Sequence, residues 1–146
     1  MISTPGALWR YRTDLAANAD PGFRGIEQKE YAMKVKRYTE VTNEDADMED
    51  ASGTTIRWLL GPADAMPNFH MRMIEVEPGG HTPRHTHHYE HEVYVLEGRG
   101  ELIDPEGEPI AIGPGSVAYV APDELHQFRN TGEATLRFLC LVPKVE

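Results

Sequence analysis

Cysteine is almost absent from this 146-residue chain, which excludes one class of small protein. Cys140 is the only cysteine, so no disulfide can form within the chain. Scaffolds that depend on several disulfides are therefore excluded. A chain of this length buries roughly two thirds of its unfolded surface and needs no such crosslinks. We expect one domain in a reducing compartment.

Long apolar runs and an excess of basic residues are also missing. No stretch approaches the ~20 residues that cross a bilayer, and the first residues lack the basic and apolar segments of a secretory signal. Lysine and arginine number 14 against 24 acidic residues, for a net charge of −10. This argues against nucleic acid and anionic membranes as partners. We expect a cytoplasmic protein.

The composition divides the chain into three parts. Residues 1–39 carry seven basic and four acidic side chains, contain Pro-Gly turns and offer one short helical segment near 13–19. We predict an irregular N-terminal arm. Residues 40–53 are strongly acidic but lack the ligand spacing and the central glycine of a calcium loop, which indicates a solvated acidic loop.

The third part, residues 54–146, has the pattern of an all-β barrel. Short apolar segments recur about every 8–12 residues, separated by glycine and proline. No strong helical pattern is available for a parallel α/β sheet. We predict a jelly-roll barrel with strands near 54–60, 69–77, 92–97, 99–104, 108–112, 116–121, 125–130 and 134–142, and with a turn at 78–80.

Three histidines, His85, His87 and His91, stand together before and at the start of one predicted strand. Alternate residues of a strand share a face, so His85 and His87 converge. His91 has the same parity and returns to them if the chain turns at 88–90. Imidazole nitrogens bind divalent metals at ~2.0–2.1 Å. The spacing predicts a metal site that still needs a fourth ligand, and His126, after a predicted turn at 122–123, can supply it.

The two histidine segments resemble the two motifs of the cupin family. The first contains a glycine, the His-x-His pair and a second glycine, and the second contains a glycine, a histidine and an asparagine: Gly79, His85, His87, Gly98, Gly115, His126 and Asn130. The resemblance spans roughly residues 61–144. It implies a small double-stranded β-helix, or jelly-roll barrel, that holds a metal near its mouth.

Two positions depart from the usual cupin pattern. Asp123 stands where a glycine is usual, which is tolerable because aspartate enters the left-handed backbone region more readily than most residues. His91 stands where most cupins have a metal-binding glutamate. The resemblance therefore implies a four-histidine site, as in a subgroup of small single-domain cupins, with the ligands His85, His87, His91 and His126.

The roles of the two glutamates beside His91 stay open at this point. Glu90 or Glu92 could coordinate in place of His91, could accept hydrogen bonds from the histidine rings, or could form an exposed acidic edge. Four neutral imidazoles leave the charge of a divalent ion uncompensated, so the site should attract an anion. The expected cofactor is one divalent transition metal per chain, with Mn, Fe or Cu favoured and Ni or Zn also compatible.

A substrate pocket is predicted beside the metal. Cys140 shares a strand face with Phe138, and Phe128 shares one with His126. Cys140 could equally be a small buried apolar residue. Arg72 alternates with methionines on its strand and points either to solvent or into the mouth of the barrel, where it could hold a carboxylate.

These features predict an oxygen-activating, dioxygenase-like oxidoreductase that acts on a small, metal-chelating and anionic molecule. One alternative is an isomerase, lyase or decarboxylase that uses the metal as a Lewis acid, for which neither Tyr119 nor Glu92 is a compelling acid or base. Another is a module that binds a small molecule or metal without catalysis. The cupin resemblance also implies a homodimer.

Overall fold

The computed structural model describes residues 33–144 of the chain. The chain divides into two units, Met1–Arg37 and Tyr38–Glu146, and nearly all of the described residues belong to the second. The helical segment predicted at 13–19 and most of the predicted arm lie outside the described residues. Among those described, no helix is long and apolar enough to cross a membrane.

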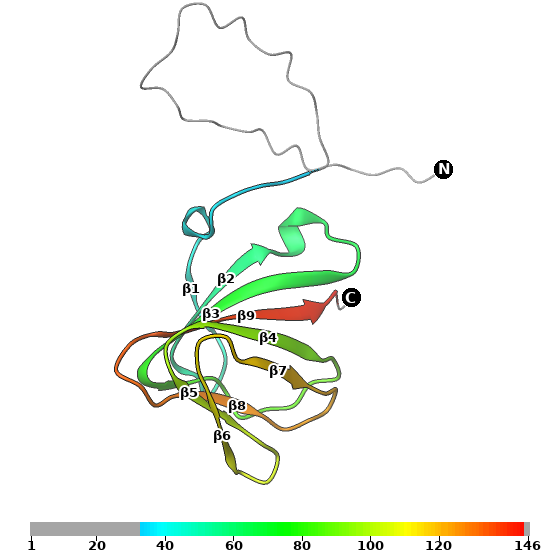
Figure 1. The fold of residues 1–146 in the computed structure, drawn as a ribbon. Helices are drawn as coiled ribbons and strands as arrows, with labels where there is room; N and C mark the ends of the chain where they lie inside the picture. Colours follow the sequence, from blue (N-terminus) through cyan, green and yellow to red (C-terminus); the bar gives the residue numbers. More distant parts are fainter. Residues whose placement is uncertain (1–32, 145–146) are drawn as a thin grey trace, which may run out of the picture. The chain divides into compact units, whose positions relative to one another are not determined.

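The second unit is built from antiparallel strands joined by short turns (Figure 1). Two 3-10 turns, η1 (Tyr38–Glu40) and η2 (Pro62–Asp64), accompany them. The strands are β1 (Glu44–Asp45), β2 (Ser52–Leu60), β3 (Phe69–His81), β4 (His91–Glu97), β5 (Gly100–Ile103), β6 (Pro109–Ile112), β7 (Val117–Val120), β8 (Gln127–Asn130) and β9 (Leu136–Pro143).

All eight strands predicted from the sequence are present, with bounds that differ by at most four residues. The predicted turn at 78–80 is wrong, because β3 continues through it to His81. Gly79 there has φ +78°, and β3 bulges at this point, since Ser52 of β2 pairs with His81 whereas Thr54 pairs with Val76. Bulges and glycines bend a strand without ending it. The acidic segment 40–53 also contains the two-residue strand β1, which pairs with β2.

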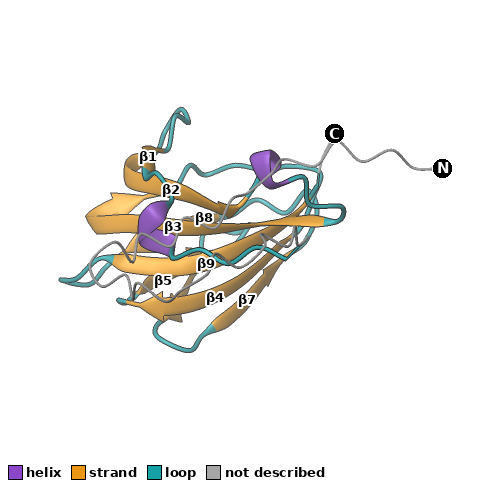
Figure 2. Ribbon diagram, turned by 90° about the horizontal axis from the view of Figure 1, so that it is seen from above, coloured by secondary structure: helices purple, strands orange, loops and turns teal. Residues whose placement is uncertain are grey.

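The sheet curls into a barrel in which β3 belongs to both halves. Its hydrogen-bonded order is β6-β5-β8-β3-β9-β4-β7, with β2 and β1 branching from β3. Most of β3 pairs with β9, from Phe69 to Val76, whereas its end at His81 pairs with β8. Strands β3, β9, β4 and β7 lie side by side in Figure 2. Strand β3 thus joins this layer to the layer of β8, β5 and β6.

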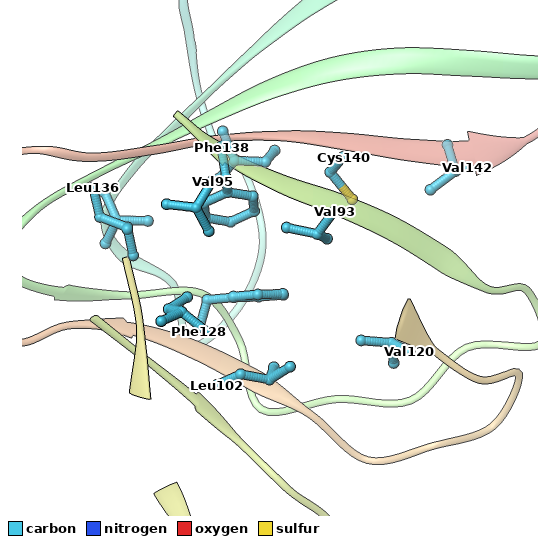
Figure 3. Packing of buried hydrophobic residues seen from close by; sticks show 12 residues of the cluster. Val93, Val95, Leu102, Val120, Phe128, Leu136, Phe138, Cys140 and Val142 are labelled. Carbon is cyan, nitrogen blue, oxygen red and sulfur yellow. The ribbon is translucent and has the colours of Figure 1, made fainter. Parts of the chain in front are cut away.

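The inward faces of the two layers enclose the core (Figure 3). Phe128 on β8 and Phe138 on β9 stack across it, with ring centroids 4.6 Å apart. Burying one such ring contributes about 1.5–3 kcal/mol. The core consists of Ile74, Val76, Val93, Val95, Leu102, Ile112, Val120, Phe128, Leu136, Phe138, Cys140 and Val142.

Two tight turns contain a residue with a left-handed backbone conformation, a glycine in one and an aspartate in the other. Gly98 has φ +81°, and a Cβ there would lie 2.4 Å from the carbonyl oxygen of Thr135. Only glycine fits this position. Asp123 has φ 64°, which confirms that the aspartate adopts the conformation expected of the usual glycine.

Candidate metal centre

Four histidines come together at one end of the barrel interior. One ring nitrogen of each lies within 4.8 Å of those of the other three. His85 and His126 belong to adjacent segments that form a β-bridge, in which the amide of His85 donates to the His126 carbonyl at 3.2 Å and the reverse bond measures 3.1 Å. His91 is the first residue of β4. The predicted cluster of His85, His87, His91 and His126 is therefore present.

Backbone carbonyls orient two of the rings. Nδ1 of His87 donates to the carbonyl oxygen of Tyr89 at 2.7 Å, and Nδ1 of His126 donates to that of Glu124 at 2.8 Å. Each bond places the proton on Nδ1 and leaves the lone pair on Nε2. The ring of Tyr89 also stacks on His87, at 4.1 Å between centroids and 8° between planes.

The spacing of the nitrogens fits ligands of one transition metal. Nε2 of His87 lies 2.7 Å from Nε2 of His91. Two nitrogens bound to one ion at right angles, each at ~2.1 Å, would be about 3 Å apart. Imidazole suits Fe, Cu, Ni and Zn, whereas Mn prefers oxygen ligands, so the donor atoms fit a divalent transition metal without selecting one.

Electrostatics keep these rings neutral. Burial lowers the pKa of His91 to about 2, and the positive charge of Arg72 adds to this effect. Burial, followed by repulsion from His126, lowers the pKa of His85 to about 4. Burial also lowers the pKa of His87 and of His126. Metal ligands must not carry the imidazolium charge, and all four rings meet this condition at neutral pH.

The carboxylates of Glu90 and Glu92 make no hydrogen bond to these rings within the described part of the chain. Glu92 is exposed, because it alternates with the buried His91 at the start of β4. Burial and the nearby charge of Glu90 raise the pKa of Glu92. The role predicted for them, as acceptors for the histidine rings, therefore stays a prediction without a contact to support it.

The four histidines line a pocket that opens to solvent. Its volume is about 70 Å³, well above the ~10–15 Å³ that a cavity needs to hold one water. The enclosed part thus suits a small ligand. Besides the histidines, it is lined by Met48, Thr54, Ile56, Arg72, Ile74, Thr82, Pro83, Tyr89, Phe128, Phe138 and Cys140.

All four residues predicted for the pocket lie in it: Arg72, Phe128, Phe138 and Cys140. Strand register explains the position of Arg72, since it pairs with Trp58 on β2 and with Cys140 on β9 and shares a face with the buried Ile74. Of the two directions left open by the sequence, the structure shows the inward one.

Other lining residues were not predicted. Thr54 and Ile56 have the parity of the inward face of β2, so strand alternation could have identified them. Tyr89 and Met48 lie outside the predicted strands, and no sequence pattern indicated them. Met48 comes from the acidic segment, so part of that segment borders the pocket.

The guanidinium of Arg72 lies between a candidate ligand and the cysteine. Its Nη2 is 3.3 Å from Nδ1 of His91 and donates to Sγ of Cys140 at 3.0 Å. Burial raises the pKa of Cys140, and the charge of Arg72 opposes this only in part. A cation does therefore stand beside Cys140, but the thiol is held protonated.

The chain is similar in sequence and fold to several known proteins. The polyketide cyclase RemF from Streptomyces resistomycificus is 38% identical, with a TM-score of 0.72 over 76% of this chain and 79% of that one. The oxalate-binding protein of Thermotoga maritima is 32% identical over 119 residues, or 78% of this chain and 97% of that protein.

A third relative is similar over a shorter stretch. The 1-methylthio-D-xylulose 5-phosphate methylsulfurylase of Rhodospirillum rubrum is 36% identical over 73 residues, which make up 49% of this chain and 46% of that enzyme. The match thus spans less than half the length of that relative. Residues 72–142 match the family model described as a cupin domain. With its jelly-roll barrel and these relatives, the chain belongs to the cupin family.

Proposed function

We propose that this protein is a metal-dependent enzyme that rearranges or cleaves a small, oxygen-chelating anion without consuming dioxygen. The observation that carries the proposal is the position of the four histidines, which converge in a small pocket together with Arg72. When bound there, a divalent ion would act as a Lewis acid on a carbonyl or carboxylate oxygen.

The charges that line the pocket favour an anionic substrate. The histidines are neutral, so they would not offset the charge of an ion, and Arg72 adds a further positive charge. None of the described residues that line the pocket is aspartate or glutamate. The planar guanidinium matches the geometry of a carboxylate. Arg72 would hold one end of the substrate while another oxygen faces the histidines.

The relatives support a reaction that is not an oxidation. RemF is a polyketide cyclase, and the Rhodospirillum rubrum relative is a methylsulfurylase. The oxalate-binding protein binds a small dicarboxylate. One name describes a cyclisation, one describes a reaction of a methylthio sugar phosphate, and one describes the binding of oxalate. None of the three describes an oxidation.

The dioxygenase-like activity predicted from the sequence is the second candidate. It is favoured by the apolar wall of the pocket, where Ile74, Phe128 and Phe138 are all buried. Such a wall would keep bulk water away from a reactive oxygen species. An oxygen electrode separates the two candidates on any substrate that is consumed, since the first predicts no oxygen uptake and the second predicts stoichiometric uptake.

The first experiment is elemental analysis of the protein purified without added metal or chelator, beside His91→Ala and a control, His88→Ala. His88 is exposed and is not one of the four clustered histidines. We expect about one equivalent of a transition metal in the wild type and in the control, and loss of it in His91→Ala. Full retention in His91→Ala would contradict the four-histidine centre. A ligand that binds but is never converted would indicate a non-catalytic module instead.

The homodimer stays a prediction. Tyr94, Val117 and Tyr119 expose apolar surface on the outer face of β4 and β7, and β7 ends the hydrogen-bonded order of the sheet. Light scattering of the full chain, which should give twice the monomer mass, checks the dimer.

A further inference from the structure

Arg72 is held inside the pocket by weak partners. Its guanidinium carbon lies 5.6 Å from the ring centroid of Trp58, and Nη2 contacts Sγ of Cys140 and Nδ1 of His91. Its Nε is buried and has no hydrogen-bond partner among residues 33–144. A protonated thiol is a poor acceptor, so the buried cation is incompletely satisfied.

The contact with His91 constrains the proton on that ring. A guanidinium has only donors, so Nδ1 of His91 must accept the hydrogen bond at 3.3 Å. A neutral imidazole has one acceptor and one N–H, which places the proton of His91 on Nε2. That is the atom 2.7 Å from Nε2 of His87, on the side where the four rings converge.

Ligation requires the opposite arrangement. A nitrogen that binds a metal needs a free lone pair, so a neutral His91 can ligate through Nε2 only with its proton on Nδ1. Nδ1 then cannot accept from Arg72. The Arg72–His91 hydrogen bond and ligation by His91 therefore exclude each other, and an ion at the centre leaves Arg72 without one of its two acceptors.

An anion resolves this conflict. Once released from His91, Arg72 keeps its contact with Sγ of Cys140 but has one free N–H on Nη2 in addition to that of its buried Nε. A carboxylate accepts from both in a bidentate manner and reduces the repulsion between the guanidinium and a divalent cation. We propose that Arg72 and His91 couple the two events, so that metal binding and binding of a small carboxylate strengthen each other. This inference rests on the proposed metal-dependent function and adds a thermodynamic coupling between binding of the metal and binding of the carboxylate.

The test measures metal affinity and needs no substrate. Full-length protein freed of metal is titrated with Co²⁺, and binding is followed by its visible absorption in buffers of equal ionic strength that contain either chloride or acetate. We expect acetate to lower the Kd for Co²⁺ at least about fivefold, the lower end of common coupling between sites. The same factor should appear when acetate affinity is measured with and without Co²⁺.

Substitution of Arg72 tests whether the effect of acetate on Co²⁺ affinity depends on this residue. Arg72→Met should bind Co²⁺ at least as tightly as the wild type in chloride and should show no enhancement by acetate. The matched control is Arg129→Met, which removes an exposed cation that bonds to Gln127 and does not line the pocket. It should keep the wild-type enhancement.

The outcomes are distinguishable. A wild-type protein that does not bind Co²⁺ overturns the proposed function. Binding that is equal in chloride and acetate, or an acetate effect that survives in Arg72→Met, overturns the coupling alone. If Arg72→Met does not fold, Arg72→Lys replaces it, because an ammonium lacks the planar fork of the guanidinium. An undiminished enhancement in a folded Arg72→Lys protein would also contradict the inference.

Discussion

Acidification of the metal-depleted protein should weaken the fold through the buried histidines. In the folded protein the pKa of His91 is about 2, whereas a histidine of the unfolded chain titrates near ~6.5. Between these values the unfolded chain binds a proton that the folded protein does not. Stability from this group is therefore complete above about pH 6.5 and is lost progressively as the pH falls toward the folded value.

The size of the loss follows from the two pKa values. Between pH 7 and pH 5 the unfolded His91 becomes almost fully protonated while the folded one stays neutral, which lowers the free energy of unfolding by about 2 kcal/mol. His91 is buried, so this value needs no large reduction for solvent. It corresponds to a decrease in Tm of about 5–10 °C for a domain of this size. His85 adds in the same direction, but less, because it is partly exposed.

Urea denaturation at pH 7 and at pH 5, after treatment with a chelator, measures this loss. His91→Gln removes the titrating group and keeps a polar side chain, so its stability should fall by about 2 kcal/mol less than that of the wild type over this range. His88→Gln, at an exposed position, should behave as the wild type does. Equal losses in His91→Gln and the wild type would refute the assignment to His91.

Three further predictions concern the metal, the core and the turns. Restoring Zn²⁺ at about 100 times its Kd should raise the free energy of unfolding of the metal-depleted protein by about 2.7 kcal/mol, and His91→Ala should abolish most of this gain in thermal melts. Phe138→Ala should cost about 3–5 kcal/mol in urea denaturation, because the ring is 1% exposed and stacks on Phe128; a cost below about 1 kcal/mol would contradict this packing. Gly98→Ala should cost at least about 1–2 kcal/mol from its backbone alone, whereas Asp123→Gly should change stability by less than about 1 kcal/mol, both measured by thermal denaturation.

The strands were predictable because their apolar residues recur with the period of a half-buried strand. Val93 and Val95, for example, alternate with exposed Glu92 and Tyr94. The end of β3 was not predictable by the same reasoning. Pro78, Gly79 and Gly80 have the composition of a turn, and the strand continues through them because His81 pairs with Ser52 on β2 and with Arg129 on β8. A partner strand distant in sequence decides that local conformation.

The amino-acid sequence by itself determined the metal-ligand types and most of the barrel. Strand parity predicted that His85, His87 and His91 converge, and the resemblance to the cupin motifs implied the four-histidine set with His126. In the structure only His91 of the four belongs to a strand, and His85 meets His126 at an isolated bridge. Only the tertiary structure decided the direction of Arg72, its contacts with Cys140 and His91, and the place of Met48 and Tyr89 at the pocket. These features depend on strand register and loop paths, which arise from pairing between segments distant in the chain.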